Sequence, residues 1–294
     1  MKPIIFALPG NENLAKFLAD QANAELGKVK IHQFPDGETY VRILSDVQSR
    51  KVFLVCTLSQ PNEKILPLYF LSKILKTQGS ASVELIAPYL AYMRQDKEFY
   101  SGEGITSHYF ASLLSSTFNS LITIDPHLHR IQNLNEIYTI PCEVLNSSGL
   151  IAKWIKENVD LPLIIGPDSE SEQWVSAVAK GADAPYIILK KIRRSDKKVE
   201  VSIPHIDDYK QHTVVLVDDI ISTATTLIET TNHLKDLEMK PPVCVGIHAV
   251  FAQDAFEKMK KAGIEKIATC NTILHPTNEI DITPMLVSAV KKLM

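Results

Sequence analysis

The stretch that decides the fold is VVLVDDIISTATTL, residues 214–227. Four apolar residues lead directly into two adjacent carboxylates, Asp218 and Asp219, and hydroxyl side chains follow at once. The apolar residues are typical of a parallel strand that is buried on both faces. Helical spacing of the apolar residues from Leu227 onward predicts a helix that begins near Thr225. Strand, polar turn and helix in this order predict an α/β unit, with the turn at the carboxyl edge of the sheet, where ligands bind.

Short apolar runs recur along the whole chain and have helical patterns between them. This alternation predicts an α/β fold in which helices flank mostly parallel central sheets. The runs are KVFLVC, VELIAPY, SLITID, LPLIIG, PYIILK, TVVLVDD, VCVGIHAV and KIATCN.

Three blocks of this pattern occur twice, in the same order, which predicts two tandem domains of similar fold. Chance similarity between α/β units is the alternative interpretation. The pairs are 51–75 with 213–237, 82–96 with 242–254, and 120–127 with 266–272. In the first copy, Cys56 and Thr57 stand where the second has the acidic pair, so the strand architecture does not require the two carboxylates.

The segment 137–149 is the best candidate for a domain boundary, because it closes one series of strands and helices. We therefore expect an N-terminal domain over residues 1–145 and a C-terminal domain over residues 146–294. The last helix, near residues 284–292, is a candidate to fold back on the first domain.

The bulk composition is that of an ordinary globular protein. The chain has 294 residues, 45% hydrophobic and 22% charged, with a net charge of −3. This balance does not favour nucleic acid or a membrane as a partner. No apolar run is long enough to span a bilayer. The apolar run near the N-terminus, residues 4–8, is shorter than the core of a signal peptide. The four cysteines are scattered, without the spacing of a metal site, which favours a reducing, cytosolic location.

The opening stretch combines two kinds of chemistry. Adjacent carboxylates can accept hydrogen bonds from vicinal sugar hydroxyls or hold a magnesium ion. The start of the next helix offers free amides and the positive end of the helix dipole to an anion. Hydroxyl side chains add donors there: Ser222, Thr223, Thr225 and Thr226. The ligand implied is a sugar phosphate; capping of the helix explains only one of these hydroxyls, and no GxxxxGK[ST] motif supports a P-loop ATPase.

The stretch 214–227 resembles the phosphoribosyl-binding loop of the phosphoribosyltransferase fold. Other segments resemble, in order, the motifs of the ribose-phosphate pyrophosphokinase family. They are QFPDGETYVRI (33–43), APYLAYMRQDKEF (87–99), IDPHLHR (124–130), IIGPDSES (164–171) and ILKKIRR (188–194). The resemblance implies two phosphoribosyltransferase-type domains, the first with a degenerate sugar loop.

The resemblance also implies the reaction. It predicts a magnesium-dependent transfer of the diphosphoryl group of ATP to the C1 hydroxyl of ribose 5-phosphate, which gives phosphoribosyl diphosphate and AMP. It implies a homo-oligomer whose nucleotide site is shared between subunits. For the sugar phosphate it implies Asp218, Asp219, Ser222, Thr223, Ala224, Thr225 and Thr226.

Residue by residue, the family motifs assign the remaining roles. ATP would be bound by Phe34, Asp36, Glu38, Arg94, Gln95 and Asp96. Catalysis would depend on Lys191, Arg193 and His127, and the metal on His127 and Asp168, with His129 as a second candidate.

Each assignment has a simpler rival. The Arg-Gln-Asp segment can be a structural ion pair, Pro-Asp-Gly-Glu a β-turn, Asp168 a helix cap, and the basic run around Lys191 a solvated or nucleic-acid-binding loop. In the resemblance, Lys191 and Arg193 belong to a loop that closes over the triphosphate.

The match departs from the family at two places. Thr225 replaces a glycine of the phosphate loop, which would be strained if that position needs a positive φ. Residues 169–172 read SESE where the family has a glycine pair. A non-catalytic nucleotide-binding homologue that associates with active subunits therefore remains an alternative, as does a phosphoribosyltransferase.

Overall fold

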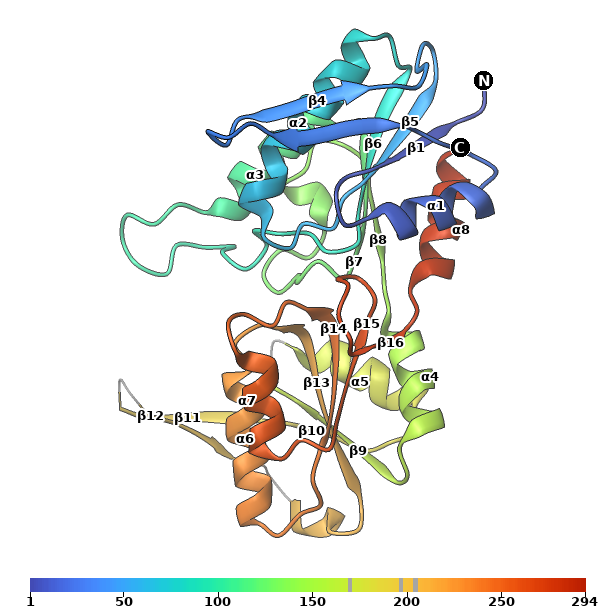
Figure 1. Ribbon diagram of the computed structural model, residues 1–294. Coiled ribbons are helices and arrows are strands. Elements are labelled where there is room, and N and C mark those ends of the chain that lie inside the picture. Colours follow the sequence, from blue (N-terminus) through green and yellow to red (C-terminus); the bar gives the residue numbers. More distant parts are fainter. Residues whose placement is uncertain (169–170, 196–197, 203–205) are drawn as a thin grey trace. The chain divides into compact units, whose positions relative to one another are not determined.

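A computed structural model of the chain describes most of its residues and divides it into two compact units. The described residues are 1–168, 171–195, 198–202 and 206–294, with the side chains of 190–195 and 198–202 outside the description. The first unit consists of Met1–Leu145 with Thr283–Met294, and the second of Asn146–Ile282 (Figure 1).

The first unit is built on a parallel sheet whose central strands are buried along nearly their whole length. Burial on both faces explains why these strands are uninterrupted apolar runs. The strand order is β2 (Glu25–Leu26), β1 (Ile4–Ala7), β5 (Lys51–Val55), β6 (Ser82–Ala87), β7 (Ser120–Ile124) and β8 (Cys142–Leu145).

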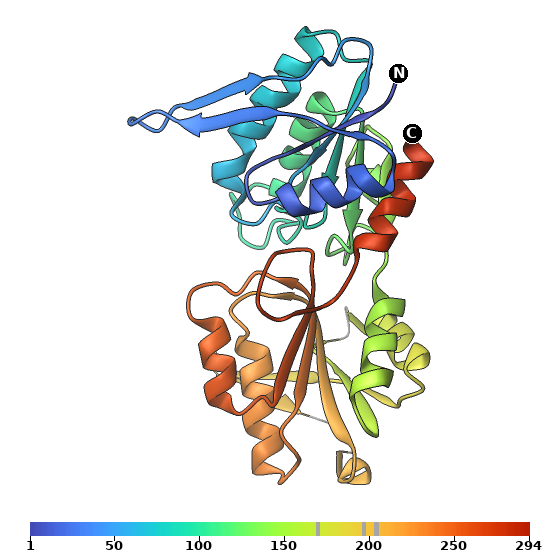
Figure 2. The same ribbon diagram turned by 45° about the vertical axis from the view of Figure 1, so that its right-hand side comes forward.

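Helices cover both faces of this sheet. One face carries α1 (Glu12–Gln21), which contacts α8 (Thr283–Leu293), the last helix of the chain (Figure 2). The other face carries α2 (Pro61–Thr77) and α3 (Thr106–Thr117). The chain therefore returns to its first unit after completing the second.

The second unit repeats this topology strand for strand. All neighbouring strands of its sheet are again parallel. The order is β10 (Tyr186–Ile188), β9 (Pro162–Gly166), β13 (Thr213–Ile221), β14 (Val243–Ala249), β15 (Lys266–Cys270) and β16 (Asn278–Ile280). The prediction of two tandem, similar α/β domains is confirmed.

The helices of the second unit follow the same plan. On one face α4 (Ser148–Asn158) contacts α5 (Glu172–Gly181), and on the other α6 (Thr225–Asp236) contacts α7 (Ala255–Ala262). Helix α4 follows the last strand of the first unit, just as α8 follows the last strand of the second. Helix α4, which follows the sheet of the first unit in sequence, thus belongs to the second unit, and α8, which follows the sheet of the second unit, belongs to the first.

Each unit also has an antiparallel hairpin at the same place in its connectivity. In the first unit it is formed by β3 (Val29–Gln33) and β4 (Thr39–Ile43), and in the second by β11 (Lys190–Ser195) and β12 (Lys198–Ser202). The apolar runs did not predict these four strands, because charged and polar residues interrupt them. The short edge strands β2, β8 and β16 were missed as well.

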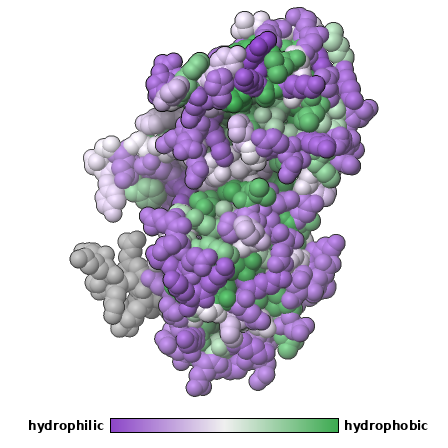
Figure 3. Space-filling view, viewed as in Figure 1, coloured by the Kyte–Doolittle hydropathy of each residue, from purple (hydrophilic) through white to green (hydrophobic). Residues whose placement is uncertain are grey.

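One face of the molecule can be followed in the space-filling view. Hydrophilic side chains cover most of the face seen in Figure 3. Among the described residues, no helix combines the length and the apolar character needed to cross a membrane.

The return of α8 gives a test of how the first unit is stabilised. Leu286 is fully buried, so Leu286→Ala should lower the free energy of unfolding of the first unit by about 2–5 kcal/mol through lost contacts and a cavity. Exposed Lys291→Ala, on the same helix, should change it by less than about 0.5 kcal/mol. Denaturant-dependent hydrogen exchange of the β1 and β5 amides measures both. Equal effects of the two substitutions would show that α8 does not stabilise this unit.

Candidate active site

Asp218 and Asp219 lie within strand β13, just beyond the point where its pairing with the neighbouring strand β9 ends. β13 pairs with β9 as far as Leu216, and with β14 as far as Ile221. Asp218 and Asp219 are half-buried, in contrast to the fully buried residues before them. The strand runs two residues further than the sequence predicted, but the two carboxylates still belong to the carboxyl edge of the sheet.

Asp168 joins these two carboxylates within the second unit. It follows β9 by two residues, and β9 is the strand beside β13. Burial, then the negative charge of Asp219, and then that of Asp168 raise the pKa of Asp218 well above its ordinary value. Like charges at this edge therefore disfavour ionisation of Asp218, as is common where a cation or a hydrogen-bond donor is to be bound.

Asp168 also does what a helix-capping residue does. Its Oδ1 accepts a hydrogen bond from the amide of Ser171 at 3.3 Å, and its carbonyl oxygen accepts one from the Ser171 hydroxyl at 2.6 Å. The capping role and the acidic cluster are thus compatible. Of the SESE segment, Ser169 and Glu170 lie outside the described residues, and Glu172 is exposed at the start of α5.

The turn after β13 leads directly into helix α6, which begins at Thr225 as predicted. The turn is held by backbone bonds from Phe251 to Ile221 at 2.8 Å and from Ala252 to Ser222 at 3.1 Å. Ala224 has a φ of 57°, whereas Thr225 is the first helical residue. The strain expected at Thr225 is therefore absent there, since the left-handed position is one residue earlier.

The hydroxyl groups of this turn lie around the start of α6. Thr223 and Thr225 are exposed, and their Oγ1 atoms are 3.2 Å apart. The first amides of a helix have no partner within the helix, so this turn can donate hydrogen bonds to an anion. All seven residues predicted to bind the sugar phosphate belong to this one strand, turn and helix start.

In the first unit, the Arg-Gln-Asp segment lies between β6 and α3. Asp96 has a side chain that is only 4% exposed and forms an ion pair with Arg130, with Oδ1 and Nη1 3.0 Å apart. Gln95 accepts a hydrogen bond from the Thr106 hydroxyl at 3.1 Å. Arg94 is exposed and has no ion pair or hydrogen bond among the residues that the structure describes. For Asp96 the structural ion pair is therefore real, while Arg94 is available to a ligand.

Sequence reasoning missed Arg130 as the partner of Asp96. The two residues are far apart in sequence, and only the adjacency of β6 and β7 brings their loops together. Arg130 was visible in the segment IDPHLHR, but nothing in that segment identifies its partner.

Two histidines follow β7 in the first unit. His127 Nδ1 and His129 Nε2 are 3.1 Å apart, and both residues are half-buried. His127, predicted to act in catalysis and metal binding, thus lies beside the residue that was ranked second.

The predicted nucleotide residues Phe34, Asp36 and Glu38 form the tip of the β3–β4 hairpin. The Gly37 amide donates to the carbonyl of Phe34 at 2.9 Å, and Gly37 has a φ of 93°, which a glycine adopts without strain. The segment is thus a tight turn, as expected. The ring of Phe34 is 46% exposed and packs edge-on against Tyr40, so an aromatic surface is presented at the tip.

Lys191 and Arg193 belong to strand β11 and not to an irregular loop. Lys191 pairs with Val201 and Arg193 with Val199 in the antiparallel hairpin, and the register shifts after Arg193. Their side chains lie outside the described residues, so their catalytic roles remain predictions.

The first unit has a counterpart of the sugar-phosphate turn. Gln60, which precedes α2, has a φ of 51°, as Ala224 does before α6. Here the amine of Lys64 donates to the Thr57 carbonyl at 2.8 Å and to Ser59 Oγ at 3.1 Å, and burial lowers the pKa of this amine. The turn of the first unit is thus closed by its own lysine.

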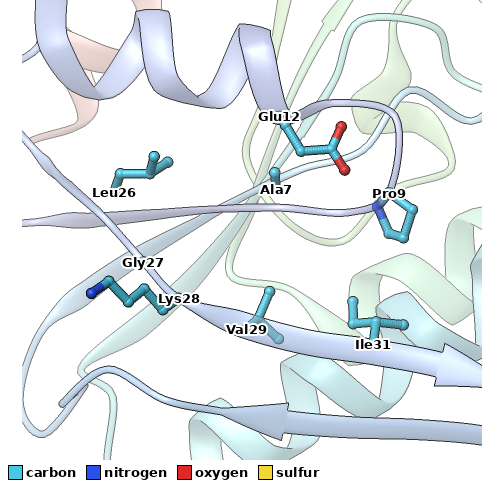
Figure 4. A pocket seen from close by; sticks show the side chains of 8 residues that line it. All are labelled: Ala7, Pro9, Glu12, Leu26, Gly27, Lys28, Val29 and Ile31. Carbon is cyan, nitrogen blue, oxygen red and sulfur yellow. The ribbon is translucent and has the colours of Figure 1, made fainter.

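A cavity of about 350 Å³ in the first unit is lined by none of these residues (Figure 4). Its lining is mostly apolar, and the Oε1 of its one carboxylate, that of Glu12, already accepts a hydrogen bond from the Gly10 amide at 3.1 Å. It therefore lacks the convergent polar groups of a reaction centre. The lining residues are Ala7, Pro9, Glu12, Leu26, Gly27, Lys28, Val29 and Ile31.

Comparison with known proteins shows the same two-domain organisation. Residues 3–117 match the N-terminal domain of ribose phosphate pyrophosphokinase, and residues 133–283 match the phosphoribosyl transferase domain. The crystal structure of phosphoribosylpyrophosphate synthetase from Mycobacterium smegmatis has the same fold, with a TM-score of 0.88, 21% identity and coverage of 100% of this chain and 99% of that one.

Relatives in sequence extend over the full length. The ribose-phosphate pyrophosphokinase of Saccharolobus solfataricus is 31% identical and covers 95% of this chain and 94% of its own. That of Methanopyrus kandleri is 30% identical, with 99% of both chains covered. The chain belongs to the ribose-phosphate pyrophosphokinase family.

Proposed function

We propose that the chain is a ribose-phosphate diphosphokinase, which transfers the diphosphoryl group of ATP to the C1 hydroxyl of ribose 5-phosphate. The observation that carries this proposal is the combination of Asp218 and Asp219 with a hydroxyl-rich turn at the start of α6, in a chain that matches the family along its whole length. The two carboxylates accept hydrogen bonds from the ribose hydroxyls, and the turn from Ser222 to Thr226 donates hydrogen bonds to the 5-phosphate. A rigid grip at both ends of the sugar fixes the position of its C1 hydroxyl.

The nucleotide side of the reaction is assigned to the first unit. Exposed Arg94 is suited to a phosphate oxygen or a purine ring, because no other described residue neutralises its charge. The Thr106 hydroxyl binds the side-chain oxygen of Gln95, so the amide nitrogen of Gln95 is free to donate to the nucleotide. Asp96, held by Arg130, acts mainly by positioning this loop.

The proposed step exchanges one P–O bond for another. The oxygen of the C1 hydroxyl forms a bond to the β-phosphorus of ATP, the bond from that phosphorus to the α,β-bridging oxygen breaks, and AMP leaves with that oxygen. The hydroxyl proton is released to solvent or a nearby base. Lys191 and Arg193 on the β11–β12 hairpin stabilise the negative charge that develops on the transferred group.

The residues present suit a magnesium ion. Asp168 offers oxygen ligands, and the raised pKa of Asp218 indicates a site with an excess of negative charge that a cation would offset. Asp168 and His127 are the residues that we assign to it, and they would hold the ion when it is bound. When bound, Mg²⁺ would neutralise the phosphate oxygens of ATP.

We further propose a homo-oligomer in which the hairpin tip of one subunit completes the nucleotide site of another. The support is the exposed ring of Phe34 at the end of a hairpin that projects from its own sheet (Figure 2). The free thiols of all four cysteines support the predicted cytosolic location.

Release of AMP tests the proposed function directly. Purified protein with Mg-ATP should form AMP only when ribose 5-phosphate is added. Lys191→Ala should reduce kcat by about 10²–10³-fold or more, because it removes a cation that acts mainly in the transition state. Exposed Lys261→Ala, on α7, serves as the matched control and should retain full activity. Nucleotide binding without AMP formation would instead identify a non-catalytic homologue, and unchanged turnover in Lys191→Ala would refute the role of that lysine.

The acidic cluster makes a separate prediction about pH. Because the folded-state pKa of Asp218 lies above its unfolded value, the folded state holds the proton more tightly. In metal-free buffer, the associated stability is fully present below about pH 4, the ordinary range of aspartate, and is lost as the pH rises toward the raised pKa.

Asp218→Asn should remove this loss and give a higher melting temperature than the wild type at neutral pH, while weakening binding of ribose 5-phosphate. Thermal melts from pH 4 to pH 8, with and without ribose 5-phosphate, measure both effects. A variant that is less stable than the wild type across this range would contradict the account of the cluster.

A further inference from the structure

A buried histidine near the end of β14 is tied to the loop that follows the neighbouring strand β15. His248 is 1% exposed and Thr272 is 2% exposed, and Nδ1 of the histidine lies 2.9 Å from Oγ1 of the threonine. Backbone pairing of β14 with β15 extends as far as Gly246 and Thr269 (Figure 1). The side-chain contact therefore holds β14 beyond the end of that backbone pairing.

The direction of this hydrogen bond follows from a second bond of the threonine. The Thr272 hydroxyl is 3.0 Å from the carbonyl oxygen of Ile247, which can only accept, so the single hydroxyl hydrogen is donated there. The hydroxyl oxygen must then accept from His248, and Nδ1 is the ring nitrogen that carries the hydrogen. The arrangement thus fixes one tautomer of the neutral imidazole.

The residue before the threonine is anchored to the strand on its other side. The amide of Asn271 donates to the carbonyl of Ile280, at the end of β16, at 3.1 Å. The side-chain oxygen of Asn271 accepts a hydrogen bond from the Ile282 amide at 2.8 Å. Thr272 thus extends from a segment that is itself held in place, so it can act as a fixed support for His248.

The segment that follows His248 holds the turn that we propose to bind the sugar phosphate. The Phe251 amide donates to the Ile221 carbonyl at 2.8 Å, and the Ala252 amide donates to the Ser222 carbonyl at 3.1 Å. Phe251 has a φ of 38°, which is unusual for a bulky residue and persists only where the surroundings fix it. The end of β14 therefore connects the buried histidine to the sugar-phosphate turn.

We propose that His248 is a positioning residue for the sugar-phosphate site. Its hydrogen bond to Thr272 fixes the end of β14, so that the amides of Phe251 and Ala252 hold the turn in the conformation that receives the 5-phosphate. The effect is on binding, because a productive site must be held to within about 0.5 Å by the residues around it. The inference rests on the proposed function for the identity of the ligand, whereas the effect of the histidine on the turn does not.

Thr272→Val tests this role, since it removes the hydroxyl with little change in the shape of the side chain. In the ligand-free protein, hydrogen exchange of the Phe251 and Ala252 amides should become about tenfold faster or more, because loss of a buried hydrogen bond makes local opening easier. The KM for ribose 5-phosphate should rise by about tenfold, while kcat and the KM for ATP should change little. Thr231→Val is the matched control: it removes a buried hydroxyl that bonds to the Leu227 carbonyl within its own helix, and it should leave exchange and all three constants unchanged.

A conservative variant separates positioning from mere filling of space. His248→Asn keeps an N–H donor near the place of Nδ1 and should retain most of the affinity for ribose 5-phosphate, whereas His248→Ala should lose as much as Thr272→Val does. A further measurement needs no variant and so does not depend on their folding. In the isotope-labelled wild type, the nitrogen shifts of the His248 ring should be those of the Nδ1–H tautomer.

Three results would overturn the proposal: unchanged exchange of the two amides in Thr272→Val, an equal rise in the KM for ATP, or the Nε2–H tautomer in the wild type. Faster exchange in Thr272→Val, together with a wild type that binds no ribose 5-phosphate, would instead overturn the proposed function and support the link from the histidine to the turn.

Discussion

Three carboxylates of the second unit, Asp168, Asp218 and Asp219, are held near one another at the carboxyl edge of a parallel sheet. Burial of Asp218, followed by repulsion from the other two carboxylates, disfavours the charged form of that residue, so the ligand-free site carries an electrostatic penalty. The surrounding structure maintains this penalty. Pairing of β9 with β13 fixes the two strand ends. The amides of Phe251 and Ala252 donate hydrogen bonds to the carbonyls of Ile221 and Ser222 and so hold the turn that follows. A sugar that donates its hydroxyl hydrogens, or a cation, relieves the repulsion, and the energy released contributes to binding.

The two units show how one topology can be given two uses. Their sheets have the same strand order, and each has a hairpin inserted between the second and third sheet strands in chain order. The left-handed residue before the next helix is also common to both, Gln60 in one and Ala224 in the other. What differs is the chemistry at the strand end: the first unit has Cys56 and Thr57 and fills the turn with Lys64, whereas the second has two carboxylates and an open helix start. The hairpin carries Phe34 in one unit and Lys191 in the other, so both inserted elements bear candidate ligand contacts.

Sequence patterns predicted the elements whose signals are local. The uninterrupted apolar residues before Asp218 predict a strand that is buried on both faces. The apolar residues after Thr225 recur at helical spacing, which predicts a helix that is buried on one face. The strands of the two hairpins were not predicted, because their residues are largely polar. The Asp96–Arg130 ion pair was not predicted, because it joins two loops that are far apart in sequence and that only the sheet brings together. The expected strain at Thr225 was placed one residue too late, since a motif fixes the order of residues but not the position of the left-handed conformation.

The central claim is that Asp218 and Asp219 bind the pentose while the start of α6 binds its phosphate. A crystal structure with ribose 5-phosphate at saturating concentration tests it most directly. The account predicts ring hydroxyls within hydrogen-bonding distance of both carboxylates and the phosphate against the amides that follow Ala224. A sugar bound elsewhere in the chain, or no sugar in this pocket, would contradict it.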